Sequence, residues 1–155
     1  MEDSYDGGCQ CGKLRYRVVG APLTLYACHC TECQKQSSSA FGMSLWVRRD
    51  ALRLLAGKPM FWERPADSGG RVVCAFCPDC GTRVYHAASP DSETVSLKAG
   101  SLDDTSWLDP VGHVWARSAQ PWVEIDRSAP GLVFEEQPAN FEEFVRRWEP
   151  GVRRS

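Results

Sequence analysis

Short stretches in which apolar and polar side chains alternate run through most of this 155-residue chain. In residues 13–18 the apolar side chains Leu14, Tyr16 and Val18 fall at every second position, the pattern of a β-strand with one buried face. Similar stretches occur at 23–27, 43–47, 52–55, 71–76, 82–86, 94–99, 111–116 and 122–125. Gly, Pro, Asp and Ser separate them. The pattern predicts a mainly β protein.

One segment near the end of the chain has helical spacing instead. Its apolar positions recur every three or four residues, at Phe141, Phe144, Val145 and Trp148. Asn140 and Glu143 have the layout of a capping box, and Pro150 follows the segment. We therefore expect a short C-terminal helix over residues 140–148 that packs on the sheet.

Length and composition indicate an ordinary globular domain. With 43% hydrophobic and 25% charged residues, a chain of this length can build a core without disulfides. No internal repeat, low-complexity tract or linker divides it. We expect a single domain over residues 1–155.

The charge balance of the chain limits the classes of partner that it can bind. The chain has 18 basic and 20 acidic residues and a pI near 5.9, which argues against a surface for nucleic acid or an anionic membrane. No apolar run approaches the roughly 18–20 residues that cross a bilayer. Residues 1–6 are acidic where a signal peptide would be basic. We expect a cytoplasmic protein, in which clustered cysteines are metal ligands more often than disulfides.

The eight cysteines form three clusters. These are Cys9-Gln10-Cys11, Cys28-His29-Cys30-Thr31-Glu32-Cys33 and Cys74-Ala75-Phe76-Cys77-Pro78-Asp79-Cys80. Zinc takes four donors in a tetrahedron, and closely spaced pairs on one turn lower the ordering cost of binding. The third cluster ends in Cys80-Gly81, which is typical of a zinc knuckle between two strands. The clusters therefore predict zinc, two ions per chain.

A knuckle supplies two ligands, so a closed site needs a second pair. Cys9 and Cys11, followed by Gly12, match the knuckle in number and in the glycine that follows. We interpret four cysteines as one structural zinc site: Cys9, Cys11, Cys77 and Cys80.

The middle cluster has three thiols, Cys28, Cys30 and Cys33. A zinc ion with three protein ligands keeps its fourth position for substrate, which distinguishes catalytic from structural sites. This cluster is the candidate active site. Cys74, in an apolar strand, leaves an alternative open, because as a fourth ligand it would close the second site.

Several other interpretations of these residues fit less well. A ferredoxin-like cluster would want a fourth cysteine where Val84 stands, and a redox Cys-x-x-Cys would precede a longer helix than residues 31–36 allow. His29 should point away from an ion shared by its two neighbours. Four aromatic residues could line a pocket: Phe41, Trp46, Trp115 and Trp122.

Four motifs occur together in this chain: Gly7-Gly8-Cys9-Gln10-Cys11-Gly12, Cys28-His29-Cys30 with Cys33, Ser39-Ala40-Phe41 and Phe76-Cys77-Pro78-Asp79-Cys80-Gly81-Thr82. Together they resemble the glutathione-dependent formaldehyde-activating enzyme family, which includes the centromere protein V domain. The resemblance covers about 7–125 of the chain, which we take as the core of the domain.

The resemblance implies a zinc-stapled β-tent fold with one structural zinc and a second zinc near the substrate. The structural ligands carry over to Cys9, Cys11, Cys77 and Cys80, and the second set to Cys28, Cys30 and Cys33. The implied activity is addition of glutathione to formaldehyde to give S-hydroxymethylglutathione, which in reverse is a carbon–sulfur lyase reaction.

Our hypothesis is a zinc-dependent enzyme of the carbon–sulfur lyase type that handles a thiol–aldehyde adduct at the three-cysteine site. Its partner is a small-molecule thiol or aldehyde, with glutathione as one candidate, rather than nucleic acid or membrane. The alternative is a non-catalytic zinc module for a protein partner, in which both zinc sites are closed. The sequence does not indicate an oligomeric state.

Overall fold

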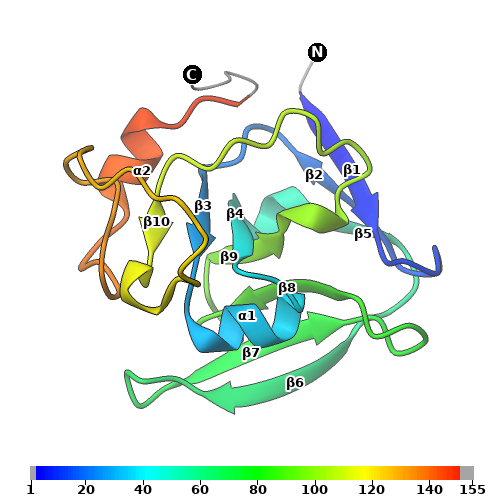
Figure 1. Ribbon diagram of the computed structural model, residues 1–155. Helices are drawn as coiled ribbons and strands as arrows, with labels where there is room; N and C mark the ends of the chain where they lie inside the picture. Colours follow the sequence, from blue (N-terminus) through cyan, green and yellow to red (C-terminus); the bar gives the residue numbers. More distant parts are fainter. Residues whose placement is uncertain (1–2, 151–155) are drawn as a thin grey trace. The chain divides into compact units, whose positions relative to one another are not determined.

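The computed structural model describes residues 3–150 (Figure 1). Two compact units are present. One comprises residues up to 22 together with 45–106, and the other comprises 23–44 together with the residues from 107 onward. Strands dominate both the first unit and the list of elements as a whole, so the predicted mainly β fold class is confirmed. A single domain over 1–155 stays a prediction.

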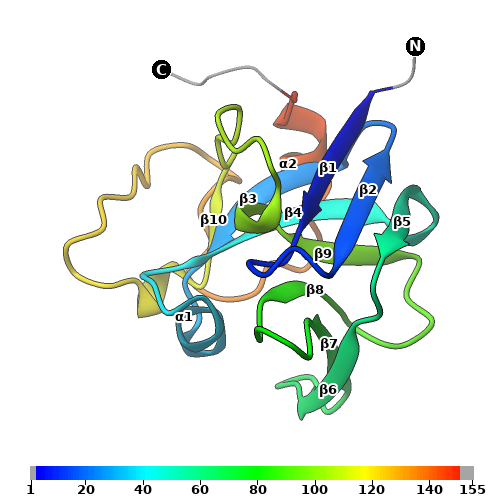
Figure 2. The ribbon, with the colours of Figure 1, turned by 90° about the vertical axis from the view of Figure 1, so that its right-hand side faces the viewer.

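The first unit contains a three-stranded antiparallel sheet, whose members lie side by side in Figure 2. In order they are β1 (Ser4–Gly8), β2 (Arg15–Val19) and β5 (Leu52–Ala56). The alternation expected in β2 is present, because Tyr16 and Val18 are buried while Arg17 is exposed and forms an ion pair with Asp6. β1 was not predicted.

The same unit contains four antiparallel strands in the order β9-β8-β7-β6. They are β6 (Met60–Pro65), β7 (Arg71–Phe76), β8 (Arg83–Ala87) and β9 (Thr94–Lys98). Two 3-10 turns, η1 (Arg49–Ala51) and η2 (Ala99–Ser101), precede β5 and follow β9. Val73, Ala75, Val84 and Leu97 are buried and form part of the core. β6 was not predicted, because most of its side chains are exposed and show no alternation.

β4 (Gly42–Arg48) begins in the second unit and ends in the first. In the second unit, β3 (Thr24–Cys28) is buried at all five positions and pairs in parallel with β10 (His113–Val114). α1 (Thr31–Ser37) follows β3, and η3 (Ala116–Ser118) follows β10.

The expected C-terminal helix is α2 (Glu142–Arg147). Phe144 is buried and packs on Tyr26, with ring centroids 5.6 Å apart. The predicted capping box is wrong. Asn140 Oδ1 accepts a hydrogen bond from the Glu142 backbone N–H, and the Glu143 side chain bonds to two arginines further along the helix instead of turning back.

Two strand predictions near the end of the chain also need correction. Of the expected strand at 111–116, the ladder with β3 contains only His113 and Val114, and residues 122–125 form no strand. The reason is that a segment with alternating apolar and polar residues forms a strand only where a neighbouring strand has free backbone N–H and carbonyl groups to pair with it. Neither α1 nor α2, with seven and six residues, reaches the length of a membrane-spanning helix, and no other helix among residues 3–150 does.

Candidate metal centres

Four cysteines of the first unit bring their sulfur atoms together, all within 4.8 Å of one another. They are Cys9, Cys11, Cys77 and Cys80, here called the four-cysteine group. Cys11 Sγ lies 3.4 Å from Cys9 Sγ and 3.8 Å from Cys77 Sγ. Sulfurs at 2.3 Å from a tetrahedral zinc would be about 3.8 Å apart. The donor set therefore fits zinc in number, type and spacing.

Two similar turns position these sulfurs. After each second cysteine stands a glycine with positive φ, Gly12 at 80° and Gly81 at 78°. The glycine N–H then donates back to the carbonyl of the first cysteine, Cys9 at 3.1 Å and Cys77 at 2.8 Å. A left-handed backbone is cheap for glycine and strained for other residues. The two glycines thus turn each pair of thiols toward the same point.

Hydrogen bonds to sulfur favour the thiolate form that binds a metal. The Leu14 N–H donates to Cys9 Sγ at 3.2 Å, and Thr82 Oγ1 lies 3.2 Å from Cys80 Sγ. Thr82 Oγ1 already accepts from the Gln10 N–H, so its own O–H is free to donate to Cys80. Hydrogen bonds from the Thr82 hydroxyl and from the Thr82 backbone N–H lower the pKa of Cys80 to about 6.

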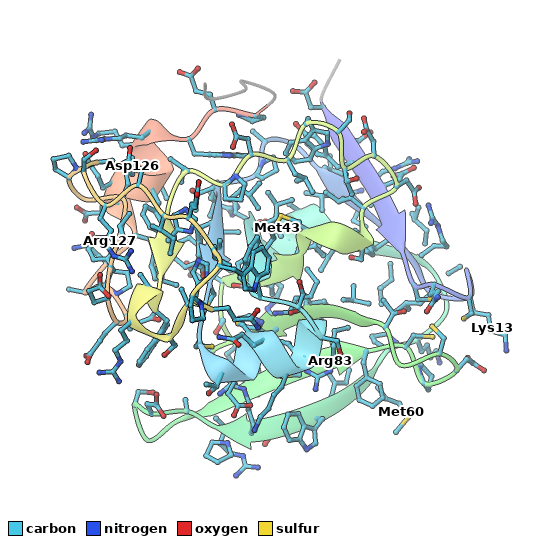
Figure 3. The ribbon with its side chains drawn as sticks, in the orientation of Figure 1. Lys13, Met43, Met60, Arg83, Asp126 and Arg127 are labelled. Atoms are coloured by element: carbon cyan, nitrogen blue, oxygen red, sulfur yellow. The ribbon has the colours of Figure 1, made fainter. Side chains whose placement is uncertain are left out.

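An exposed ion pair also joins the two turns. Lys13 follows the first pair of cysteines in the chain, and its Nζ lies 2.8 Å from Asp79 Oδ1 in the knuckle. Figure 3 labels Lys13 at the surface of this unit. Exposed pairs contribute little to stability, so this pair adds little to the attachment of the two turns.

The second unit holds the three-cysteine group, which consists of Cys28, Cys30 and Cys33. Their sulfurs are likewise within 4.8 Å of one another. Cys28 ends β3, Cys30 is the N-cap residue of α1, and Cys33 lies buried in the first turn of that helix. Cys30 Sγ accepts a hydrogen bond from the Cys33 N–H at 3.3 Å, as an N-cap side chain does.

Two of the three thiols have pKa values shifted in opposite directions. Hydrogen bonds from Cys28 and Cys33 hold the pKa of Cys30 well below its usual range, whereas contacts with Cys30 and Cys33 raise the pKa of Cys28. The Gln36 amide also donates to Cys33 Sγ, at 3.5 Å. One thiolate therefore forms readily, whereas three adjacent thiolates need a cation to balance their charge.

His29 lies between two of these cysteines and points elsewhere, as expected. It is fully buried, and its Nε2 lies 2.9 Å from His113 Nδ1. Its ring packs 5.2 Å from the ring of Phe41. Burial, with His113 and Arg127 nearby, lowers the pKa of His29 to about 4, so the imidazole is neutral. Among residues 3–150, no histidine nitrogen belongs to either cysteine group.

Cys74 joins neither group among the described residues. It is buried in the middle of β7, opposite Trp62 of β6 and His86 of β8. This is the environment of a small core residue. The ligand set gathered in the second unit accordingly contains three sulfurs.

A hollow of about 480 Å³ lies beside α1 in the second unit. It is lined by Gln34, Lys35, Ser38, Ser39, Ala40, Gln120 and Trp122. Of the four aromatic residues that the sequence singled out for a pocket, Trp122 is the one that lines this hollow, and it is 70% exposed. The glutamines were missed, because nothing in their local sequence marks them.

Hydrogen bonds connect this hollow to the chain segment that carries the three cysteines. Trp122 Nε1 donates to Gln120 Oε1 at 2.7 Å, and Gln120 Nε2 donates to Gln34 Oε1 at 3.3 Å. Gln34 Nε2 in turn donates to the carbonyls of His29 and Ser118, each at 2.8 Å. Gln34, which lines the hollow, is therefore tied to the loop between Cys28 and Cys30.

Comparison with known proteins places the chain in a family. A crystal structure of a Rhodobacter sphaeroides protein is similar, with a TM-score of 0.52 and 19% sequence identity over 65% of this chain and 90% of that chain. At this identity the likeness shows the fold alone. Residues 4–118, which include every cysteine, match the family model described as glutathione-dependent formaldehyde-activating enzyme. The chain belongs to the glutathione-dependent formaldehyde-activating enzyme family.

Proposed function

We propose that this chain is a zinc-dependent enzyme of the carbon–sulfur lyase type that forms or cleaves the adduct of a thiol and an aldehyde. The observation that carries the proposal is the three-cysteine group, three sulfurs within 4.8 Å of one another with no fourth cysteine or histidine among the described residues. Family membership favours glutathione and formaldehyde as the thiol and the aldehyde. The four-cysteine group would hold a second, structural zinc.

The chemistry follows from the ligand count. When bound by three sulfurs, zinc supplies a positive charge beside the substrate sulfur, which lowers the pKa of the substrate thiol. Cys28, Cys30 and Cys33 already contribute three negative charges, which makes the site poor at activating water. Their arrangement favours thiol addition over hydrolysis.

The reaction balances without an oxidant or reductant. In the direction of addition, the substrate S–H bond breaks and a bond forms between sulfur and the carbonyl carbon. The proton lost from sulfur ends on the former carbonyl oxygen. In the reverse direction, the hydroxyl proton leaves, the carbon–sulfur bond breaks, and thiol and aldehyde are released.

The neighbouring residues hold the cysteines in position. β10 fixes the loop after β3, since the His29 N–H donates to the Val114 carbonyl at 3.0 Å and the two histidine rings are hydrogen-bonded. The Cys33 N–H and the Gln36 amide orient two of the sulfurs. A preorganised ligand set of this kind loses little entropy when the metal binds.

The hollow beside α1 would hold the part of the substrate that does not react. Its volume of about 480 Å³ is within the range of small-molecule sites. Lys35 is the one charged residue among those that line it, and it suits a carboxylate. Gln120 Nε2 has a second N–H beyond the one it donates to Gln34, and this N–H suits a peptide carbonyl, while Trp122 offers a flat apolar surface.

The test is exchange between glutathione and its formaldehyde adduct, followed by NMR, together with zinc content per chain. We expect the zinc-loaded protein to accelerate exchange, Cys30→Ser to lose the acceleration and one zinc, and Cys74→Ser to keep both. No acceleration by fully loaded protein at millimolar glutathione would contradict the proposal. Loss of the second zinc in Cys74→Ser would instead favour a closed, non-catalytic module.

A further inference from the structure

Gln34 of α1 has a side-chain amide that is almost fully engaged inside the protein. Its Nε2 group donates to the His29 carbonyl and to the Ser118 carbonyl, each at 2.8 Å. Its Oε1 atom accepts from Gln120 Nε2 at 3.3 Å. Both N–H groups of the amide are therefore used, and one lone pair of Oε1 is left over. A side chain with so few free groups suits a positioning role better than direct recognition of a ligand.

The bond from Gln34 to His29 acts on the loop that carries two of the cysteines. The His29 N–H belongs to the peptide unit shared with Cys28, and it donates to the Val114 carbonyl of β10 at 3.0 Å. The His29 carbonyl belongs to the next peptide unit, which leads to Cys30, and Gln34 holds that carbonyl. β10 and Gln34 thus fix the two successive peptide planes between these cysteines. Because peptide planes are rigid, their orientation limits the directions of the two cysteine side chains.

The bond from Gln120 continues the network into the hollow. Gln120 Oε1 accepts from Trp122 Nε1 at 2.7 Å, while its Nε2 donates to Gln34. Neither amide can turn over. A reversed Gln34 would place Oε1 against two carbonyl oxygens, and a reversed Gln120 would place its NH₂ group against the Trp122 N–H. Gln120 is therefore held with one N–H left for an acceptor bound in the hollow that it lines.

We propose that Gln34 is a positioning residue that couples occupancy of the hollow to metal binding by the three-cysteine group. The inference rests on the proposed function in one respect, namely that the hollow holds the part of the thiol substrate that does not react. An acceptor bonded to Gln120 holds that amide, Gln120 holds Gln34, and Gln34 holds the cysteine loop. A loop already held in place loses less entropy when a metal binds, so each ligand strengthens binding of the other.

Lys35 provides a contrast on the same helix. It follows Gln34 in α1 and lines the same hollow. Within residues 3–150 its side chain makes no hydrogen bond or ion pair. A ligand held by Lys35 alone therefore has no hydrogen-bonded path to the cysteine loop, and substitution of Lys35 is the matched control for substitution of Gln34.

Cobalt in place of zinc reports directly on the cysteine groups, because its absorption depends on the number and geometry of the sulfur ligands. The Cys30→Ser spectrum, to which the four-cysteine group alone contributes, is subtracted from the others. Gln34→Met keeps the approximate length of the side chain and removes both donors and the acceptor. We expect it to weaken cobalt binding by the three-cysteine group at least tenfold. Lys35→Met, the same substitution one position later, should not weaken it.

The tripeptide γ-Glu-Ala-Gly tests the coupling without any reaction, because it is glutathione with a hydrogen atom in place of the thiol group. At millimolar concentration it should raise the cobalt affinity of the wild-type three-cysteine group about fivefold, the effect of one net hydrogen bond. Gln120→Leu leaves both bonds from Gln34 to backbone carbonyls intact. It should bind cobalt as the wild type does and lose the response to the tripeptide.

Unchanged cobalt affinity in Gln34→Met, or an equal loss in Lys35→Met, would overturn the proposal. So would a wild type that does not respond to the tripeptide, or a Gln120→Leu protein that still responds. If Gln34→Met does not fold, the comparison of wild type with Gln120→Leu decides by itself. None of these measurements requires turnover, so failure of glutathione exchange would contradict the proposed lyase activity without affecting the coupling, and loss of the coupling would leave that activity standing.

Discussion

At the scale of single residues, the cysteine groups depend on neighbours that the cysteines themselves do not reveal. Thr82 receives a hydrogen bond from the Gln10 N–H and lies 3.2 Å from Cys80 Sγ, so one hydroxyl links both turns of the four-cysteine group. Outer groups of this kind orient the ligands and favour their deprotonated form. The strength of metal binding therefore depends on more than ligand count.

Thr82→Val should weaken metal binding by the four-cysteine group about 10- to 100-fold, because the Cys80 thiolate loses its hydroxyl donor. Competition with a chelator, read as the zinc released from this group, measures the change. Thr82→Ser keeps the hydroxyl and is the matched control. Equal zinc retention in the valine and serine variants would show that the hydroxyl is unimportant.

Because its hydroxyl is buried, Tyr16 should make the folded protein less stable at high pH. Burial raises the pKa of its hydroxyl to about 12, although the hydroxyl bonds to Ser101 Oγ at 2.7 Å. As the pH rises above about 10, the unfolded chain loses the tyrosine proton before the folded chain does, so unfolding becomes easier. Between about pH 10 and 12 this costs about 2 kcal/mol.

Urea denaturation across this pH range measures the slope. Tyr16→Phe removes the titrating group and should flatten the dependence relative to the wild type. An identical slope in the two proteins would assign the alkaline loss of stability to other groups.

At the scale of elements, the turn after each cysteine pair is the part most exactly specified by local sequence. Gly81 has a φ of 78° and nothing near the position that a Cβ would occupy, so its requirement is purely conformational. Such positions occur at turns whose direction matters, and here the turn aims two sulfurs.

Gly81→Ala should lower the free energy of unfolding by about 1 kcal/mol, because alanine must adopt the left-handed conformation. Denaturation of the zinc-loaded protein measures it. Gly100→Ala is the matched control, since Gly100 has no positive φ and an equally open Cβ position. Equal effects at the two glycines would contradict the turn argument.

Phe144 is the buried residue within the C-terminal helix. Phe144 is 1% exposed and contacts the rings of Tyr26 and Phe134, whereas Val145 next to it is 39% exposed. Phe144→Ala should cost about 3–5 kcal/mol, the range for a large buried aromatic. Val145→Ala should cost far less. Thermal or urea denaturation compares the two variants, and similar losses would mean that α2 does not pack through Phe144.

At the scale of the whole molecule, the two cysteine groups differ in what they connect. The four-cysteine group joins residues 66 positions apart in the chain, as between Cys11 and Cys77, whereas the three-cysteine group lies within one β-strand and the start of α1. A long-range link constrains the unfolded chain far more than a local one does.

Metal removal should therefore have unequal consequences. Cys77→Ser should lose one zinc and the folded state of the first unit, whereas Cys30→Ser should lose one zinc and remain folded. Zinc content and circular dichroism of the two variants measure this. A folded Cys77→Ser protein without its zinc would show that the core alone sustains this unit.

The sequence by itself was sufficient to predict those elements that depend on interactions between residues close together in the chain. Cysteine spacing and the glycines at 12 and 81 specify turns, and helical spacing specifies α2, because each depends on residues a few positions apart. Alternation likewise marked β2 through its buried Tyr16 and Val18.

Tertiary structure decided the features that depend on distant partners. β6 has no alternation because neither of its faces is covered, so its strand conformation comes from pairing with β7. The apparent strand at 122–125 found no partner, and Asn140 capped a nearer N–H than expected. Gln34 and Gln120 line the hollow and are hydrogen-bonded to each other, although 86 positions of sequence separate them. Backbone hydrogen bonds between strands and contacts between loops depend on which segments meet, and local spacing does not encode those meetings.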